Sequence, residues 1–282
     1  MENLLHRPEI QSAVLPFVIA LLISLSLSKL TATAWQWALL AAFAVSAVLI
    51  NGLTLTPLTG TRKIILLIGA ALLSAALLPR VLAHLRLQRP FTDLFCLFAL
   101  VWVFGAVVAR MPSTQIAMFA AGSVAFAVTL LLSFERVAAN PAQLHGAGLS
   151  LLLGVGLSAS AAASALLGQL ALALAAASGG GFLAWVIVGA APPRGNVKQW
   201  VVTLPYLLAP LLLGLASVMF ARLPWYALIP LALIPLAVSL VPVPVKLQAR
   251  FTRALLASLP GLVIALALAF WVWHSGSSAS GY

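Results

Sequence analysis

Acidic side chains are scarce in this chain of 282 residues. Four occur, at Glu2, Glu9, Asp93 and Glu135, against 15 lysines and arginines. Glu2 and Glu9 lie in the tail before the first predicted span, and the other two lie at the ends of predicted membrane spans. Proton-coupled carriers commonly use carboxylates buried in the membrane, and Mg²⁺-dependent enzymes need clustered carboxylates. The sequence lacks acidic groups for both, so we interpret Asp93 and Glu135 as structural charges.

Cysteine and closely spaced histidine ligands are lacking as well. Cys96 is the single cysteine, which excludes an intrachain disulfide and a metal site built from several cysteines. The four histidines show no metal-binding spacing, and the zinc-protease pattern His-Glu-x-x-His is missing. We interpret them as solvated or interfacial groups: His6, His84, His145 and His274. The sequence thus predicts no cofactor and no metal, and it favours a protein that is not an enzyme.

Charge of either sign is rare, and long runs separate the charged residues. They make up 7% of the chain, and hydrophobic residues make up 63%, whereas a soluble domain carries roughly 25% charged residues. A helix needs about 20 apolar residues to cross a bilayer, where its backbone must satisfy its own hydrogen bonds. The apolar runs do not alternate with polar residues as a β-barrel requires. The sequence therefore predicts an all-α fold, a polytopic transmembrane helix bundle.

Turn-forming residues divide the chain into about ten spans. Asn51-Gly52 closes the second span, Arg110-Met111-Pro112 and Asn140-Pro141 make tight turns, and Thr92 is a candidate helix N-cap. The predicted spans are 10–28, 34–52, 63–81, 93–110, 113–134, 147–165, 168–190, 199–221, 224–242 and 254–273. Because the connections are short, we expect a single integral membrane domain over 1–282, with a Gly/Ser-rich, disordered tail at 275–282.

The charge-free stretch 137–193 permits two interpretations. It is too long for one crossing at 1.5 Å per residue. It either divides near 164–168 into two full spans, or it forms one long helix that breaks at 179–181 and leaves 182–191 as a half-helix. The second interpretation gives nine spans plus a half-helix.

Basic residues favour the first interpretation through the positive-inside rule. With ten spans, ten lysines and arginines follow odd-numbered spans and five lie on the other side. The second interpretation divides them nine to six, with the opposite orientation. We therefore prefer ten spans, with both termini outside the cytoplasm.

Small residues recur every fourth position across this stretch, at Gly156, Ser160, Ser164 and Gly168. In lipid such a ridge lets helix backbones approach closely. We interpret it as static packing rather than as a mobile helix pair, although it runs through the predicted break.

Uncharged polar residues within the spans are the candidate substrate ligands. They are Asn51, Gln115, Gln169 and Tyr206. A polar group buried in lipid costs several kcal/mol unless it has a partner, so we expect each to face the bundle.

Basic residues between spans are candidates for contact with lipid headgroups or another anion. One group lies in the leucine-rich segment 80–92, and a second lies at 246–253. The residues are Arg80, His84, Arg86, Arg89, Lys246, Arg250 and Arg253. Since no soluble basic module exists, we expect membrane lipids as partners and no nucleic acid.

The layout of ten short-looped, Ala/Leu-rich spans resembles that of small-molecule permeases of the drug/metabolite kind, without a shared motif. It favours a permease-like transporter of a small neutral, anionic or amphipathic molecule. We keep two alternatives: a non-catalytic membrane subunit that anchors or assembles a larger complex, and a lipid-headgroup-modifying membrane enzyme. Compactness and composition favour a bacterial inner (plasma) membrane. A membrane protein partner or a homo-oligomer fits the ridges of small residues.

Overall fold

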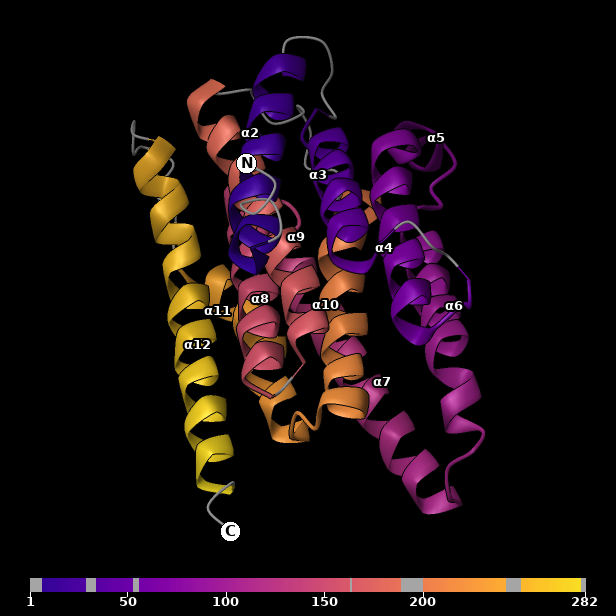
Figure 1. The fold of residues 1–282 in the computed structure, drawn as a ribbon. Helices are drawn as coiled ribbons and strands as arrows, with labels where there is room; N and C mark the ends of the chain where they lie inside the picture. The colour runs from indigo at the N-terminus through magenta and orange to yellow at the C-terminus, as the bar shows by residue number, and fades with distance from the viewer. Residues whose placement is uncertain are drawn as a thin grey trace.

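The computed structural model describes residues 7–28, 34–52, 56–162, 164–188, 200–241 and 250–279. Over these ranges the chain forms helices joined by short connections, and no strand occurs in them (Figure 1). The helices are α2 (Leu15–Leu27, after the π-helical turn η1, Ile10–Val14), α3 (Ala34–Asn51), α4 (Gly60–Leu77), α5 (Pro79–His84), α6 (Gln88–Val108), α7 (Ser113–Val137), α8 (Pro141–Ala161), α9 (Ala165–Val188), α10 (Trp200–Ala221), α11 (Leu228–Leu240, after the 3-10 turn η2, Trp225–Ala227) and α12 (Arg250–Ala279).

The predicted all-α, polytopic bundle is confirmed. Among the described residues, nine helices are long and apolar enough to cross a membrane, and a shorter apolar helix covers Trp225–Leu240. That shorter helix occupies the ninth of the ten predicted spans. The chain is therefore a multi-pass membrane protein by its helix lengths and composition.

The stretch 137–193 holds two full helices. Helix α8 ends at Ala161, and α9 begins at Ala165, close to the predicted division. The glycines at 179–181 lie inside α9 and do not break it. The alternative with one long helix and a half-helix at 182–191 is therefore wrong. Three consecutive glycines lower helix propensity, but they do not end this helix, which continues to Val188.

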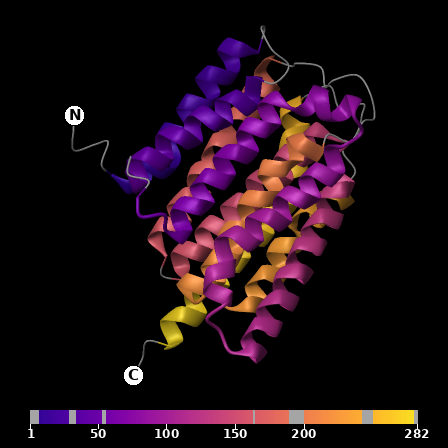
Figure 2. The same cartoon turned by 90° about the vertical axis from the view of Figure 1, so that its right-hand side faces the viewer.

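Successive helices alternate in direction along the bundle. Figures 1 and 2 show them packed side by side, with α5 at the upper end of Figure 1 and the turn between α6 and α7 at the lower end. Contacts agree with this order. Gly146 of α8 lies beside Ala257 of α12, and Gly154 lies beside Ala265, so these two helices run parallel. Alternation places the start of α2 and the end of α12 on the same side.

Helix α10 is the innermost element. Of the residues in its membrane span 94% are buried, whereas 22% are buried in that of α7. Helix α10 contacts α4, α6, α7, α8 and α9. Pro205 and Pro210 lie inside it, and neither supplies a backbone N–H donor to the helix. A central helix surrounded on all sides is the element that can reach the interior of the bundle with polar side chains.

The ridge of small residues serves the packing of α8 on α9. A Cβ on Gly168 would overlap the Ser160 hydroxyl, and a Cβ on Gly156 would come within 2.8 Å of Leu172. The turn after Ala161 folds the ridge onto itself, so its two halves face each other across the helix pair. The predicted break and the ridge are therefore compatible.

Two local expectations are wrong. Thr92 is not an N-cap, because α6 begins at Gln88 and the Thr92 hydroxyl donates to the Gln88 carbonyl at 2.9 Å. The same early start places Asp93 inside the helix rather than at its first residue. Helix α12 extends to Ala279, past the position where the tail was expected to begin, and 280–282 lie outside the described residues.

Candidate functional site

A hydrogen-bonded histidine–tyrosine pair lies in the interior of the bundle. His145 of α8 and Tyr206 of α10 place Nδ1 and Oη 3.1 Å apart. The two residues are 4% and 1% exposed. Burying two such groups is costly unless each finds a polar partner. Their mutual hydrogen bond joins α8 to the central helix.

Aromatic rings from two further helices enclose the pair. Trp35 of α3 meets the His145 ring edge-on, with 4.7 Å between centroids, and stacks beside Tyr206 at 5.9 Å. Phe182 of α9 stacks on the His145 imidazole with 5.5 Å between centroids, and the Trp185 ring centroid lies 6.4 Å from that of His145. Such centroid separations are typical of favourable aromatic pairs. We call these five residues the aromatic cluster.

Local sequence explains where His145 lies. Asn140 caps α8 by accepting hydrogen bonds from the backbone N–H groups of Ala142 and Gln143, and Pro141 occupies the first turn. His145 is then four residues into the helix, about 6 Å along its axis. Tyr206 is six residues into α10, about 9 Å along. The cluster therefore lies inside the bundle, near the end that carries α5.

A glycine makes room for the tyrosine ring. A Cβ on Gly148 would overlap the Tyr206 ring, so α8 approaches α10 closely only because this position has no side chain. Gly148 is buried on the face of α8 that also carries His145. The site thus depends on a residue that takes no direct part in it.

Buried polar side chains lie on helices that form the cluster or that pack against them. Within the described residues, Ser24 Oγ and Gln36 Oε1 make no hydrogen bond, and the Ser178 hydroxyl lies beside Tyr206. Gln36 follows Trp35 on α3, and Ser178 lies one helical turn before Phe182. Ser24 of α2 and Trp35 both flank Gly181, where a Cβ would lie 3.7 Å and 3.9 Å from them. Polar atoms left unpaired in a membrane interior are candidate contacts for a ligand.

The four predicted substrate ligands do not come together. Tyr206 belongs to the aromatic cluster, near the start of α10. Asn51 ends α3, whereas Gln115 and Gln169 lie in the first turns of α7 and α9, so alternation places these three near the opposite end of the bundle. Gln115 is exposed, and Asn51 and Gln169 are half-buried. Gln115 does not face the bundle as expected, because the start of α7 lies at the periphery.

The predicted headgroup contacts divide into two kinds. His84 and Arg86 are exposed in the connection between α4 and α6, whereas the Arg80 side chain lies outside the described part of the structure. Lys246 lies outside the described residues, and for Arg250 and Arg253 only the helical backbone of α12 is described. Contact of these residues with headgroups remains a prediction.

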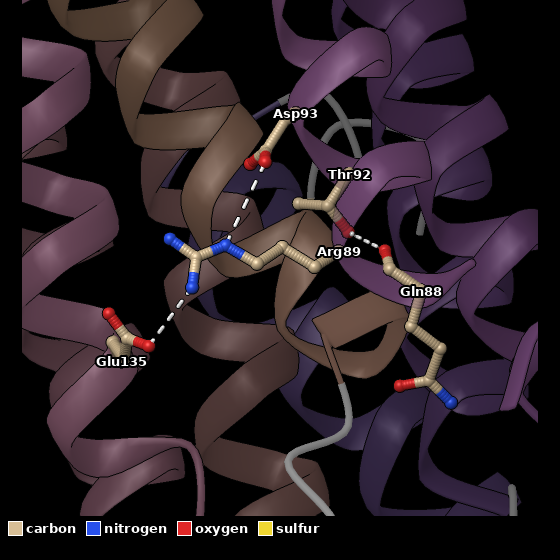
Figure 3. A network of polar contacts seen from close by, with 5 residues as sticks. All are labelled: Gln88, Arg89, Thr92, Asp93 and Glu135. Carbon is tan, nitrogen blue, oxygen red and sulfur yellow. Dashed lines mark hydrogen bonds and ion pairs between the residues drawn. The ribbon is translucent and has the colours of Figure 1, made fainter. Parts of the chain in front are cut away.

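Arg89 takes part in a network within the protein. Its guanidinium pairs with Glu135 of α7 at 3.2 Å and with Asp93 at 3.9 Å (Figure 3), and it lies 5.2 Å from the Trp200 ring. The neighbouring Gln88 accepts a hydrogen bond from the Trp200 backbone N–H at 3.1 Å. The start of α6, the end of α7 and the start of α10 therefore meet at one end of the bundle.

In the described ranges, no three His, Cys, Asp or Glu side chains lie close enough together to hold a metal ion. Sequence analysis selected Tyr206 but missed His145, Trp35, Phe182 and Trp185. One signal was present, because His145 lies in 137–193, the longest charge-free stretch.

The chain matches no family model, and it has no significant match among curated proteins or solved structures.

Proposed function

We propose that this multi-pass membrane protein is a permease-like carrier whose solute contacts the aromatic cluster. The supporting observation is the buried His145–Tyr206 pair, which is enclosed by aromatic rings on and around the innermost helix. Polar residues inside membrane proteins are costly, and they commonly mark pathways for substrates. The unpaired polar atoms of Ser24 and Gln36 offer further contacts to a solute.

The chemistry of the cluster favours a neutral, amphipathic solute. Its side chains offer hydrogen-bonding groups and aromatic faces, and none carries a permanent charge. An anion would leave water for a site with no fixed positive charge among its members, which is unfavourable. A small molecule with a planar or apolar body and one or two polar groups matches both kinds of surface.

The alternatives require different things of this cluster. A subunit that anchors a larger complex needs contacts on its outer surface, and no solute has to pass His145. An enzyme that modifies headgroups needs its reacting groups at the membrane interface, whereas the cluster is enclosed by helices. Flux through the protein therefore separates the carrier from both.

Proteoliposomes test the proposal. We expect the purified protein to release at least one of three radiolabelled neutral solutes (uracil, adenosine or thymidine) faster than protein-free vesicles do. His145→Ala and Tyr206→Phe should reduce that flux at least tenfold. Tyr226→Phe is the matched control, because Tyr226 is 46% exposed on the outer surface. Flux equal to that of empty vesicles for all three solutes, or flux that the cluster variants leave unchanged, would contradict the proposal.

A further inference from the structure

A groove between α3 and α4 lies on the outside of the bundle, separate from the aromatic cluster. Its volume is about 580 Å³. It extends from Leu40 to Asn51 along α3 and from Arg62 to Leu73 along α4. Either segment covers about 17 Å along the helix axis. The hydrocarbon of one leaflet is about 15 Å thick, half of roughly 30 Å, so the groove has the length of one acyl chain.

Small residues keep the groove open. Ala44 and Ala47 line it on α3, and Gly69 and Ala70 line it on α4. A Cβ on Gly69 would meet no atom within 4 Å. In a bilayer such a space is filled by lipid, since an empty groove would give up the dispersion contacts of its walls.

The groove is apolar along its length and polar at one end. Asn51 and Arg62 lie at that end, where α3 ends and α4 begins. The Arg62 guanidinium donates to the Pro57 carbonyl at 2.7 Å, which holds it beside the groove. Lys63 turns away, since its Nζ donates to the Trp102 carbonyl of α6 at 3.0 Å. The cation at the mouth of the groove is therefore Arg62.

We propose that this groove binds one acyl chain of an anionic phospholipid, with the lipid phosphate on Arg62. The apolar walls match the chain, and the guanidinium matches the phosphate in charge and in its planar arrangement of donors. The lipid belongs to the leaflet that holds the connection between α3 and α4. The site binds lipid whether or not the protein carries a solute.

Native mass spectrometry of the purified protein tests this site. The protein is mixed with phosphatidylglycerol or with phosphatidylcholine of identical acyl chains, and the retained lipid is counted. We expect wild-type protein to retain phosphatidylglycerol at least fivefold better. Arg62→Gln should bring the two lipids to near parity, whereas Arg110→Gln, at the same end of the bundle on an exposed residue, should keep the preference.

A second pair of variants tests the groove itself. Gly69→Leu places a side chain in the groove where a Cβ meets no atom within 4 Å, so it should lower retention of phosphatidylglycerol at least fivefold. Gly105→Leu on α6 is the control, because its Cβ would meet only Val101, at 3.9 Å. Melting temperatures of all four variants should stay near that of wild type. Equal effects of Arg62→Gln and Arg110→Gln, or of Gly69→Leu and Gly105→Leu, would show non-specific annular lipid and overturn the proposal.

Discussion

Gly148 of α8 lies against the ring of Tyr206 on α10 with no space for a methyl group between them. This contact allows α8 to place His145 within hydrogen-bonding distance of the Tyr206 hydroxyl, at 3.1 Å. The geometry of the buried pair thus rests on the absence of a side chain one turn along the same helix.

Gly148→Ala should therefore destabilise the protein. The added methyl group forces the Tyr206 ring or helix α8 to move, and overpacking of this kind costs about 1–3 kcal/mol. Unfolding in mixed micelles, followed by tryptophan fluorescence, measures the loss. Gly69→Ala is the control, because its Cβ meets open space. Equal stability of Gly148→Ala and Gly69→Ala would contradict the close contact.

The hydrogen bond between His145 and Tyr206 should appear as a coupling energy. In a double-mutant cycle with His145→Phe and Tyr206→Phe, we expect a coupling of about 0.6 kcal/mol, with about 1.7 kcal/mol as the upper end for membrane interiors. The same unfolding assay measures it. A control cycle uses Tyr226→Phe in place of Tyr206→Phe. Because Tyr226 faces lipid, it should show no coupling to His145.

Adjacent glycines of α9 should respond very differently to alanine. A Cβ on Gly180 would overlap the backbone carbonyl of Phe17 on α2, whereas a Cβ on Gly179 would make ordinary contacts at 3.7 Å. A backbone atom cannot rotate aside as a side chain does, so Gly180→Ala should cost about 1–3 kcal/mol or separate α2 from α9. Gly179→Ala should change the free energy of unfolding little. The reverse order would show that α9 is rotated from the position described.

Much of the fold could be predicted from the sequence, because long charge-free runs need no knowledge of packing to be identified as spans. The division of 137–193 followed from the placement of basic residues, and the observed turn between Ala161 and Ala165 agrees with it. Helix ends were harder to predict. Gln88 begins α6 before Thr92 because its side chain bonds to the Pro79 carbonyl and the Trp200 backbone, a tertiary effect that no local pattern reveals.

The site was largely beyond the sequence. Tyr206 could be selected as a polar residue within a span, but nothing local indicates that α8 and α10 are neighbours. His145 lies only four residues from the start of its helix, which resembles an interfacial position, yet side chains of α3, α9 and α10 pack against it and leave it 4% exposed. Asn51, Gln115 and Gln169 are uncharged polar residues within spans, as Tyr206 is, but their positions near the opposite end of the bundle separate them from it.

The alternating path of the helices through a bilayer is the central claim, and cysteine labelling tests it most directly. In a Cys96→Ala background, His84→Cys lies in the connection before α6 and Arg110→Cys in the turn after it, at opposite ends of the bundle. On intact spheroplasts of a bacterial expression host, a membrane-impermeant maleimide should label Arg110→Cys and should reach His84→Cys only after the membrane is opened. Labelling of both positions in intact spheroplasts would contradict the account, and labelling of His84→Cys alone would reverse the proposed orientation.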